Sequence, residues 1–223
     1  MAKVYLSPSD QESNVYAYDN TNEAVQCGRI AEACRAALER SGVEVKVGHM
    51  ISMAQKCSES NAFGADLHVP IHTNAFNGKV MGTRMFCYSA GGKGMVACKA
   101  IFARLAPITP GESENIQVNA DYYEVRVPAA PTAYIECEFH DTVEGAKWIV
   151  ENTVLIGETI ARGICDYFGV KFVEQPKPVE PEKKDVLYRV QIGAYKIKAN
   201  AEKRQAEAKA AGFTDAFIVT VKQ

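Results

Sequence analysis

Short apolar segments alternate with amphipathic helical patterns along most of this chain, and this alternation restricts the fold more than any other feature. Strands are predicted at 3–6, 43–47, 67–72, 82–88 and 131–139, and helices at 21–41, 52–63, 94–105, 141–148 and 154–168. Such alternation favours a largely parallel sheet. The expected fold class is α/β: a mostly parallel, twisted sheet flanked by helices on both faces, with a small C-terminal β-α-β unit.

The C-terminal part of the chain has a different organisation. Residues 174–185 combine three prolines with many charges, which is typical of an extended linker. A strand, an alanine-rich helix and a second strand follow within 186–223, which is shorter than most units that fold alone. We therefore predict a main domain at 1–173, a linker at 174–185 and a small β-α-β unit at 186–223.

Composition argues against several function classes. The net charge of -2, without a basic stripe, gives no basis for nucleic-acid binding. No apolar run approaches the roughly 18 residues of a membrane span, and the N-terminus shows no apolar stretch of signal-peptide length. We expect a protein made in the cytoplasm, without a signal peptide, a membrane span or a nucleic-acid partner.

The seven cysteines include no C-x-x-C pair. We interpret them as small buried side chains in a protein of a reducing compartment. A thiol nucleophile at Cys137 is a weaker alternative, because nothing nearby in the sequence would activate it.

One histidine stands at the end of a predicted strand, where open α/β sheets bind ligands and metals. This is His72. His68 lies roughly 13 Å earlier along the same strand, too far to share an ion. Glu23 begins a helix and Glu136 lies late in another strand. Three protein ligands and a separate glutamate that moves a proton make a catalytic zinc site. The alternative is a core histidine and two acids that only complement helix ends.

Three motifs resemble those of the zinc-dependent N-acetylmuramoyl-L-alanine amidases of the third type. They are TNE at 21–23, IHTN at 71–74 and PTAYIECEF at 131–139. Their order and spacing match the family over about residues 3–169. The resemblance implies that Glu23 and His72 bind zinc and that Glu136 is the catalytic glutamate.

The loop after the first strand departs from the usual family pattern, aspartate-proline-glycine-histidine-glycine, in which the histidine is the first ligand. Here residues 7–14 read SPSDQESN, similar to a variant loop within the same family. By that resemblance Gln11 takes the ligand position and Asp10 is the next candidate. Chemistry alone favours Asp10, because an amide oxygen is a poor zinc ligand. His140 is a further alternative, as a ligand or in contact with the substrate.

Four residues are predicted to contact the substrate: Asn14, Asn74, Glu138 and His140. We also expect the long segment 107–130 to shape the substrate groove, because connections of this length are often functional.

The C-terminal unit resembles the first half of a SPOR domain, a module that binds the glycan strands of peptidoglycan. The resemblance rests on YRVQIGAY at 188–195 and AAGF at 210–213. Complete domains contain two such halves. The unit at 186–223 is therefore expected to pair with a second chain in a homodimer, or else to be a remnant or a flexible tail.

These resemblances imply that the protein binds peptidoglycan and, with Zn²⁺, cuts the amide bond between N-acetylmuramic acid and L-alanine. The organisation resembles that of phage endolysins, with a host autolysin as the alternative; both act on the bacterial cell wall. Two other classes are a non-catalytic peptidoglycan-binding protein with a degenerate metal site and a zinc peptidase of the stem peptide. The intact Glu136 argues against the first, because binding does not need this acid.

Overall fold

The computed structural model describes residues 1–114, 116–175 and 189–221. By its internal contacts the chain divides into two compact units, Met1–Pro176 and Lys177–Gln223. The linker predicted at 174–185 lies outside the described residues from residue 176 onward.

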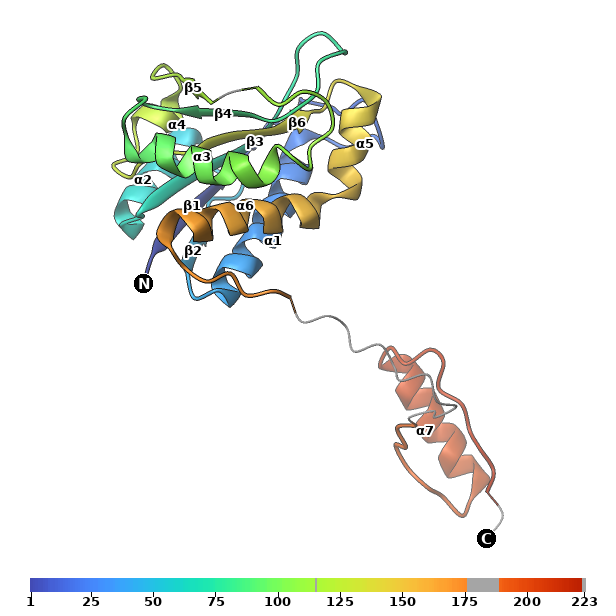
Figure 1. The fold of residues 1–223 in the computed structure, drawn as a ribbon. Coiled ribbons are helices and arrows are strands. Elements are labelled where there is room, and N and C mark those ends of the chain that lie inside the picture. Colours follow the sequence, from blue (N-terminus) through green and yellow to red (C-terminus); the bar gives the residue numbers. More distant parts are fainter. Residues whose placement is uncertain (115, 176–188, 222–223) are drawn as a thin grey trace. The chain divides into compact units, whose positions relative to one another are not determined.

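A six-stranded sheet with the order β2-β1-β3-β6-β4-β5 forms the centre of the first unit (Figure 1). The strands are β1 (Lys3–Pro8), β2 (Glu44–Val47), β3 (Leu67–Asn74), β4 (Arg84–Cys87), β5 (Gln117–Val118) and β6 (Tyr134–Phe139). All neighbouring strands are parallel except β4 and β6, which are antiparallel. The predicted α/β fold with a mostly parallel sheet is confirmed.

Helices cover both faces of this sheet. They are α1 (Glu23–Arg40), α2 (Met53–Phe63), α3 (Lys93–Leu105), α4 (Tyr123–Arg126), α5 (Val143–Glu151) and α6 (Thr153–Phe168). Helices α1 and α3 both pack on α6 (Figure 1). The main core lies between these helices and the sheet, where Leu6, Val69 and Ile135 are fully buried.

The opposite face of the sheet carries polar side chains under α2 and α4. Side chains alternate between faces along a strand, so Tyr5 and His68 point away from the main core. Tyr5 donates to Glu59 of α2 at 3.2 Å, and the imidazole of His68 lies 3.3 Å from Glu124 of α4. Strand β5 and helix α4 were not predicted within 107–130, because the periodicity there is weak.

The described part of the second unit contains one helix, α7 (Lys198–Ala210), where the sequence predicts one. The strands predicted around it are not formed within residues 189–221, and Tyr188 lies outside the described residues. Two short strands with no further partner have little stability of their own. None of the helices in the described ranges combines the length and the apolar character needed to cross a membrane.

Candidate active site

His72 and Glu136 lie opposite each other on the parallel strands β3 and β6. Both residues are nearly buried, with 7% and 9% of their surface exposed. Because parallel strands end at the same edge of a sheet, this pairing places both side chains where ligands bind in open α/β folds.

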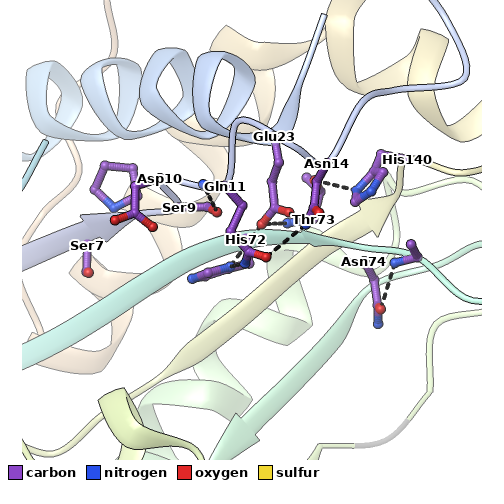
Figure 2. Close-up of polar contacts among 12 residues, drawn as sticks. Ser7, Ser9, Asp10, Gln11, Asn14, Glu23, His72, Thr73, Asn74 and His140 are labelled. Carbon is purple, nitrogen blue, oxygen red and sulfur yellow. Dashed lines mark hydrogen bonds and ion pairs between the residues drawn. The ribbon is translucent and has the colours of Figure 1, made fainter. Parts of the chain in front are cut away.

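Glu23 reaches the same place from the first residue of α1 (Figure 2). Its Oε1 lies 2.9 Å from Nδ1 of His72 and accepts the backbone N–H of Thr73 at 3.4 Å. The helix begins here because the side chain of Asn22 accepts the backbone N–H of Val25 at 3.0 Å, as an N-cap does. The capped helix thus fixes the carboxylate beside the imidazole.

The charges of this site are coupled. Burial opposes the ionisation of Glu23, but the hydrogen bond and charge of His72 outweigh it and lower the pKa of Glu23. Burial also opposes the charge on His72, yet Glu23 and Glu136 together raise the pKa of its imidazole. Burial raises the pKa of Glu136 to about 8. Nε2 of His72 and Oε2 of Glu136 have no hydrogen-bond partner among the described residues.

Gln11 and Asn14 complete the cluster from the loop after β1 (Figure 2). Nδ2 of Asn14 donates to Oε2 of Glu23 at 2.6 Å and to Oε1 of Gln11 at 2.9 Å. Nε2 of Gln11 lies 3.4 Å from Nδ1 of His72. The loop therefore brings the amide of Gln11 next to the imidazole.

Asp10, the other candidate in this loop, faces a different partner. Its carboxylate lies 3.9 Å from Nζ of Lys56, a buried lysine of α2 that also donates to the carbonyl of Pro8 at 2.7 Å. In Figure 2 its side chain lies apart from those of Glu23 and His72.

The donor groups fit a zinc ion. Imidazole and carboxylate are normal zinc ligands, and the Glu23 and His72 donor atoms already lie 2.9 Å apart. A half-turn of the Gln11 amide would present its oxygen as a third, weaker donor.

His140, the further ligand candidate, lies beside Thr73 instead. Between His72 and Asn74 the pairing of β3 with β6 shifts by one residue, and such a bulge changes the face to which following residues point. Nδ1 of His140 lies 2.9 Å from Oγ1 of Thr73, and its ring stacks on Tyr16 at 4.9 Å. Burial lowers its pKa.

In the part of the chain that the structure describes, the donor atoms of Glu23, His72 and His140 do not all three lie within 4.8 Å of one another. His140 therefore lies near the site without joining the Glu23 and His72 donors.

Asn74 and Glu138 make contacts with the backbone. Oδ1 of Asn74 accepts the N–H of Ala75 at 2.8 Å. Glu138 is fully buried and accepts the N–H groups of Gly82 at 2.8 Å and Phe139 at 2.6 Å. Burial raises the pKa of Glu138 to about 7. Both side chains hold turns near the site, and their contact with substrate stays a prediction.

Tyr134 is a site residue that the sequence reasoning missed. Its ring stacks on the imidazole of His72, with centroids 4.8 Å apart and planes at 18°. It precedes Glu136 by two positions on β6, so strand periodicity places both on one face. Tyr122 packs on Tyr134 at 5.1 Å, so the segment 107–130 does reach this part of the molecule.

Comparisons with known proteins identify the family of this chain. The sequence profile of the N-acetylmuramoyl-L-alanine amidase family matches residues 9–166, and that of the SPOR domain matches residues 171–222. A sporulation-specific N-acetylmuramoyl-L-alanine amidase of Bacillus subtilis (strain 168) is 26% identical over 226 residues. That alignment covers 98% of this chain and 85% of the relative.

Solved structures share the fold of the first unit. The catalytic domain of the amidase CwlV from Bacillus (Paenibacillus) polymyxa superposes with a TM-score of 0.68 at 16% identity, covering 77% of this chain and all of that domain. The amidase AmiC2 of Nostoc punctiforme gives 0.66 at 19% identity, covering 75% of this chain and 97% of that protein. With the family profile matching most of its length, this chain belongs to the N-acetylmuramoyl-L-alanine amidase family.

Proposed function

We propose that this amidase cuts the bond between the lactyl group of N-acetylmuramic acid and L-alanine with a Zn²⁺ ion held by Glu23, His72 and Gln11. The main support is the convergence of the Glu23 carboxylate and the His72 imidazole, 2.9 Å apart, beside Glu136 on the neighbouring strand. The proposed chemistry requires these groups to lie close together, although they are far apart in the sequence.

Glu136 is the proposed general base and acid. A bound Zn²⁺ would lower the pKa of a water molecule and polarise the amide carbonyl. Glu136 would accept the proton of the attacking water and return it to the nitrogen of the leaving L-alanine. Its buried Oε2 has no partner among the described residues, and its raised pKa suits proton exchange near neutral pH.

Two neighbours would hold Glu23 and His72 in place. Asn14 donates to Oε2 of Glu23, and Tyr134 stacks on His72. Oriented by these contacts, Glu23 and His72 need not reorganise when the ion or the substrate binds.

Mass spectrometry of digested peptidoglycan tests the reaction. Intact stem peptides with free L-alanine amino termini indicate the amidase, fragments of the peptide indicate a peptidase, and the absence of products indicates a binding protein. We expect the first result, its loss after chelation and its recovery with Zn²⁺. Full activity of chelated His72→Ala protein would contradict the metal mechanism.

We further propose that the C-terminal unit binds peptidoglycan and pairs with a second copy. The SPOR profile supports binding. Many apolar side chains of this unit are exposed: Val190, Ile192, Tyr195, Ile197, Phe213, Phe217, Ile218, Val219 and Val221. Such surface is usually covered by a partner. Light scattering should give a dimer for the full chain and a monomer for a chain that ends at Gly169; a monomeric full chain would contradict pairing.

The proposed place of action is the bacterial cell wall. A phage endolysin and a host autolysin would use the same chemistry and differ in how the enzyme reaches the wall. Producing the enzyme inside cells, with and without a membrane-permeabilising protein, separates the two: lysis only after permeabilisation fits the endolysin, and lysis without it fits an exported autolysin.

A further inference from the structure

A second group of metal-ligating side chains lies on the sheet face covered by α2 and α4. Cys57 comes from α2, His68 from β3 and Glu124 from α4. One donor atom of each lies within 4.8 Å of those of the other two. All three residues are at most 2% exposed. Within the ranges 1–114, 116–175 and 189–221, no other three histidine, cysteine or acidic side chains meet this closely.

The imidazole of His68 has contacts on its ring and on one nitrogen, but its other nitrogen lacks a hydrogen-bond partner among the described residues. Its Nε2 lies 3.3 Å from Oε1 of Glu124, and its ring stacks on that of Tyr5 at 5.4 Å with planes at 7°. Its Nδ1 is buried and has no hydrogen-bond partner among the described residues. Burying a polar atom without a partner is costly, and such an atom in a native protein calls for an explanation.

The chemical types of the three ligands indicate which metal ion would bind. A thiolate, an imidazole and a carboxylate are all normal ligands of Zn²⁺, whereas Ca²⁺ and Mg²⁺ prefer oxygen ligands alone. The hydroxyl of Ser7 donates a hydrogen bond to Oε1 of Glu124. Its oxygen therefore also lies at the edge of the group. All three residues are buried, which leaves no access for a substrate, so an ion bound here would have a structural role rather than a catalytic one.

We propose that Cys57, His68 and Glu124 bind a structural Zn²⁺ ion, separate from the ion proposed at Glu23 and His72. The ion would join α2, β3 and α4 and so tie the segment 107–130 to the sheet. That segment also supplies Tyr122, whose ring packs on Tyr134. The second site would thereby help to hold the wall of the active site.

Replacement of zinc by Co²⁺ tests this assignment, because a thiolate bound to Co²⁺ gives an intense near-ultraviolet charge-transfer band. The full chain is produced in zinc-depleted medium with Co²⁺. We expect the band in the parent protein and in the double variant Glu23→Gln/His72→Ala, which lacks the ligands of the proposed catalytic site. The test therefore stands even if the zinc mechanism at that site fails.

Two cysteine variants form a matched pair. Cys57→Ser should abolish the band, whereas Cys34→Ser, at a buried cysteine in α1, should keep it; circular dichroism checks that both are folded. If Cys57→Ser does not fold, the Glu124→Gln variant is measured in its place. We expect its band to be shifted and its Co²⁺ to be lost to a chelator at least about tenfold faster than in the parent.

Three outcomes would overturn the proposal. They are a parent protein without the band, a band that persists in folded Cys57→Ser, and a Glu124→Gln variant with the parent's spectrum and rate of metal loss. In each case the group would be a buried, hydrogen-bonded pair of His68 and Glu124 beside a thiol.

Discussion

His72 and Glu136 are direct neighbours across strands β3 and β6. The strand order β3-β6-β4 makes this possible, because the late strand β6 inserts between two strands that follow each other in the chain. A general base must lie within hydrogen-bonding reach of the water that it activates. The topology therefore supplies the closeness that the proposed chemistry requires.

Replacing Glu136 by glutamine should remove activity and leave zinc bound. The amide keeps the size of the side chain but cannot accept the proton of water, so we expect kcat to fall about 10²–10⁴-fold. The measurement is the release of L-alanine amino termini from peptidoglycan, with the metal content determined in parallel. Glu144→Gln, at an exposed acid in the first turn of α5, is the control and should retain activity. A Glu136→Gln enzyme with the parent's rate would exclude the proposed role.

Restoring a histidine in the loop after β1 should strengthen metal binding. Gln11 lies next to His72, and an imidazole is a better zinc ligand than an amide. We expect Gln11→His to lower the zinc dissociation constant about tenfold or more, measured by chelator competition in a Cys57→Ser background. Asp10→Ala should change it little, because Asp10 faces Lys56. The opposite ranking would make Asp10 the ligand.

The stability of the protein should decrease as the pH rises, because the carboxyl group of Glu138 loses its proton. Burial raises the pKa of this carboxyl to about 7 from an ordinary value of 4.5, so the folded state keeps a proton that the unfolded state releases. Its contribution to the free energy of unfolding is complete below about pH 4.5 and is lost as the pH rises through about 7.

Glu138→Gln should remove this decline, because the amide does not ionise and its oxygen can still accept the N–H groups of Gly82 and Phe139. In urea unfolding, the free energy of unfolding of the variant minus that of the parent should increase by about 1–3 kcal/mol from about pH 5 to about pH 9. Equal pH dependence in both proteins would refute the assignment. A changed KM for peptidoglycan would support the predicted substrate contact of Glu138.

Removing the ring of Tyr134 should disturb His72. Stacked aromatic pairs contribute about 0.5–1.5 kcal/mol beyond the area they bury, and a displaced ligand also slows the reaction. Tyr134→Ala should therefore reduce stability and lower kcat/KM by about tenfold or more. Tyr134→Phe keeps the ring and should retain both properties, so a strong loss in the phenylalanine variant would point to the hydroxyl group instead.

Local patterns in the sequence determined the elements of the fold and the residue types of the site. The alternation of Leu67, Val69 and Ile71 is visible without any partner strand, because side chains on a strand change face at every residue. The helix that begins at Glu23 likewise follows from its cap and its apolar spacing. These features depend on near neighbours in the chain, and the structure contains them where they were expected.

Tertiary contacts decided which residues meet. The one-residue shift between β3 and β6 placed His140 beside Thr73, and Asp10 lies beside the buried Lys56. The group formed by Cys57, His68 and Glu124 also arises only in the folded chain, because each residue comes from a different element. Strand register and helix packing depend on contacts between distant segments, and the periodicity of a single segment carries no information about them.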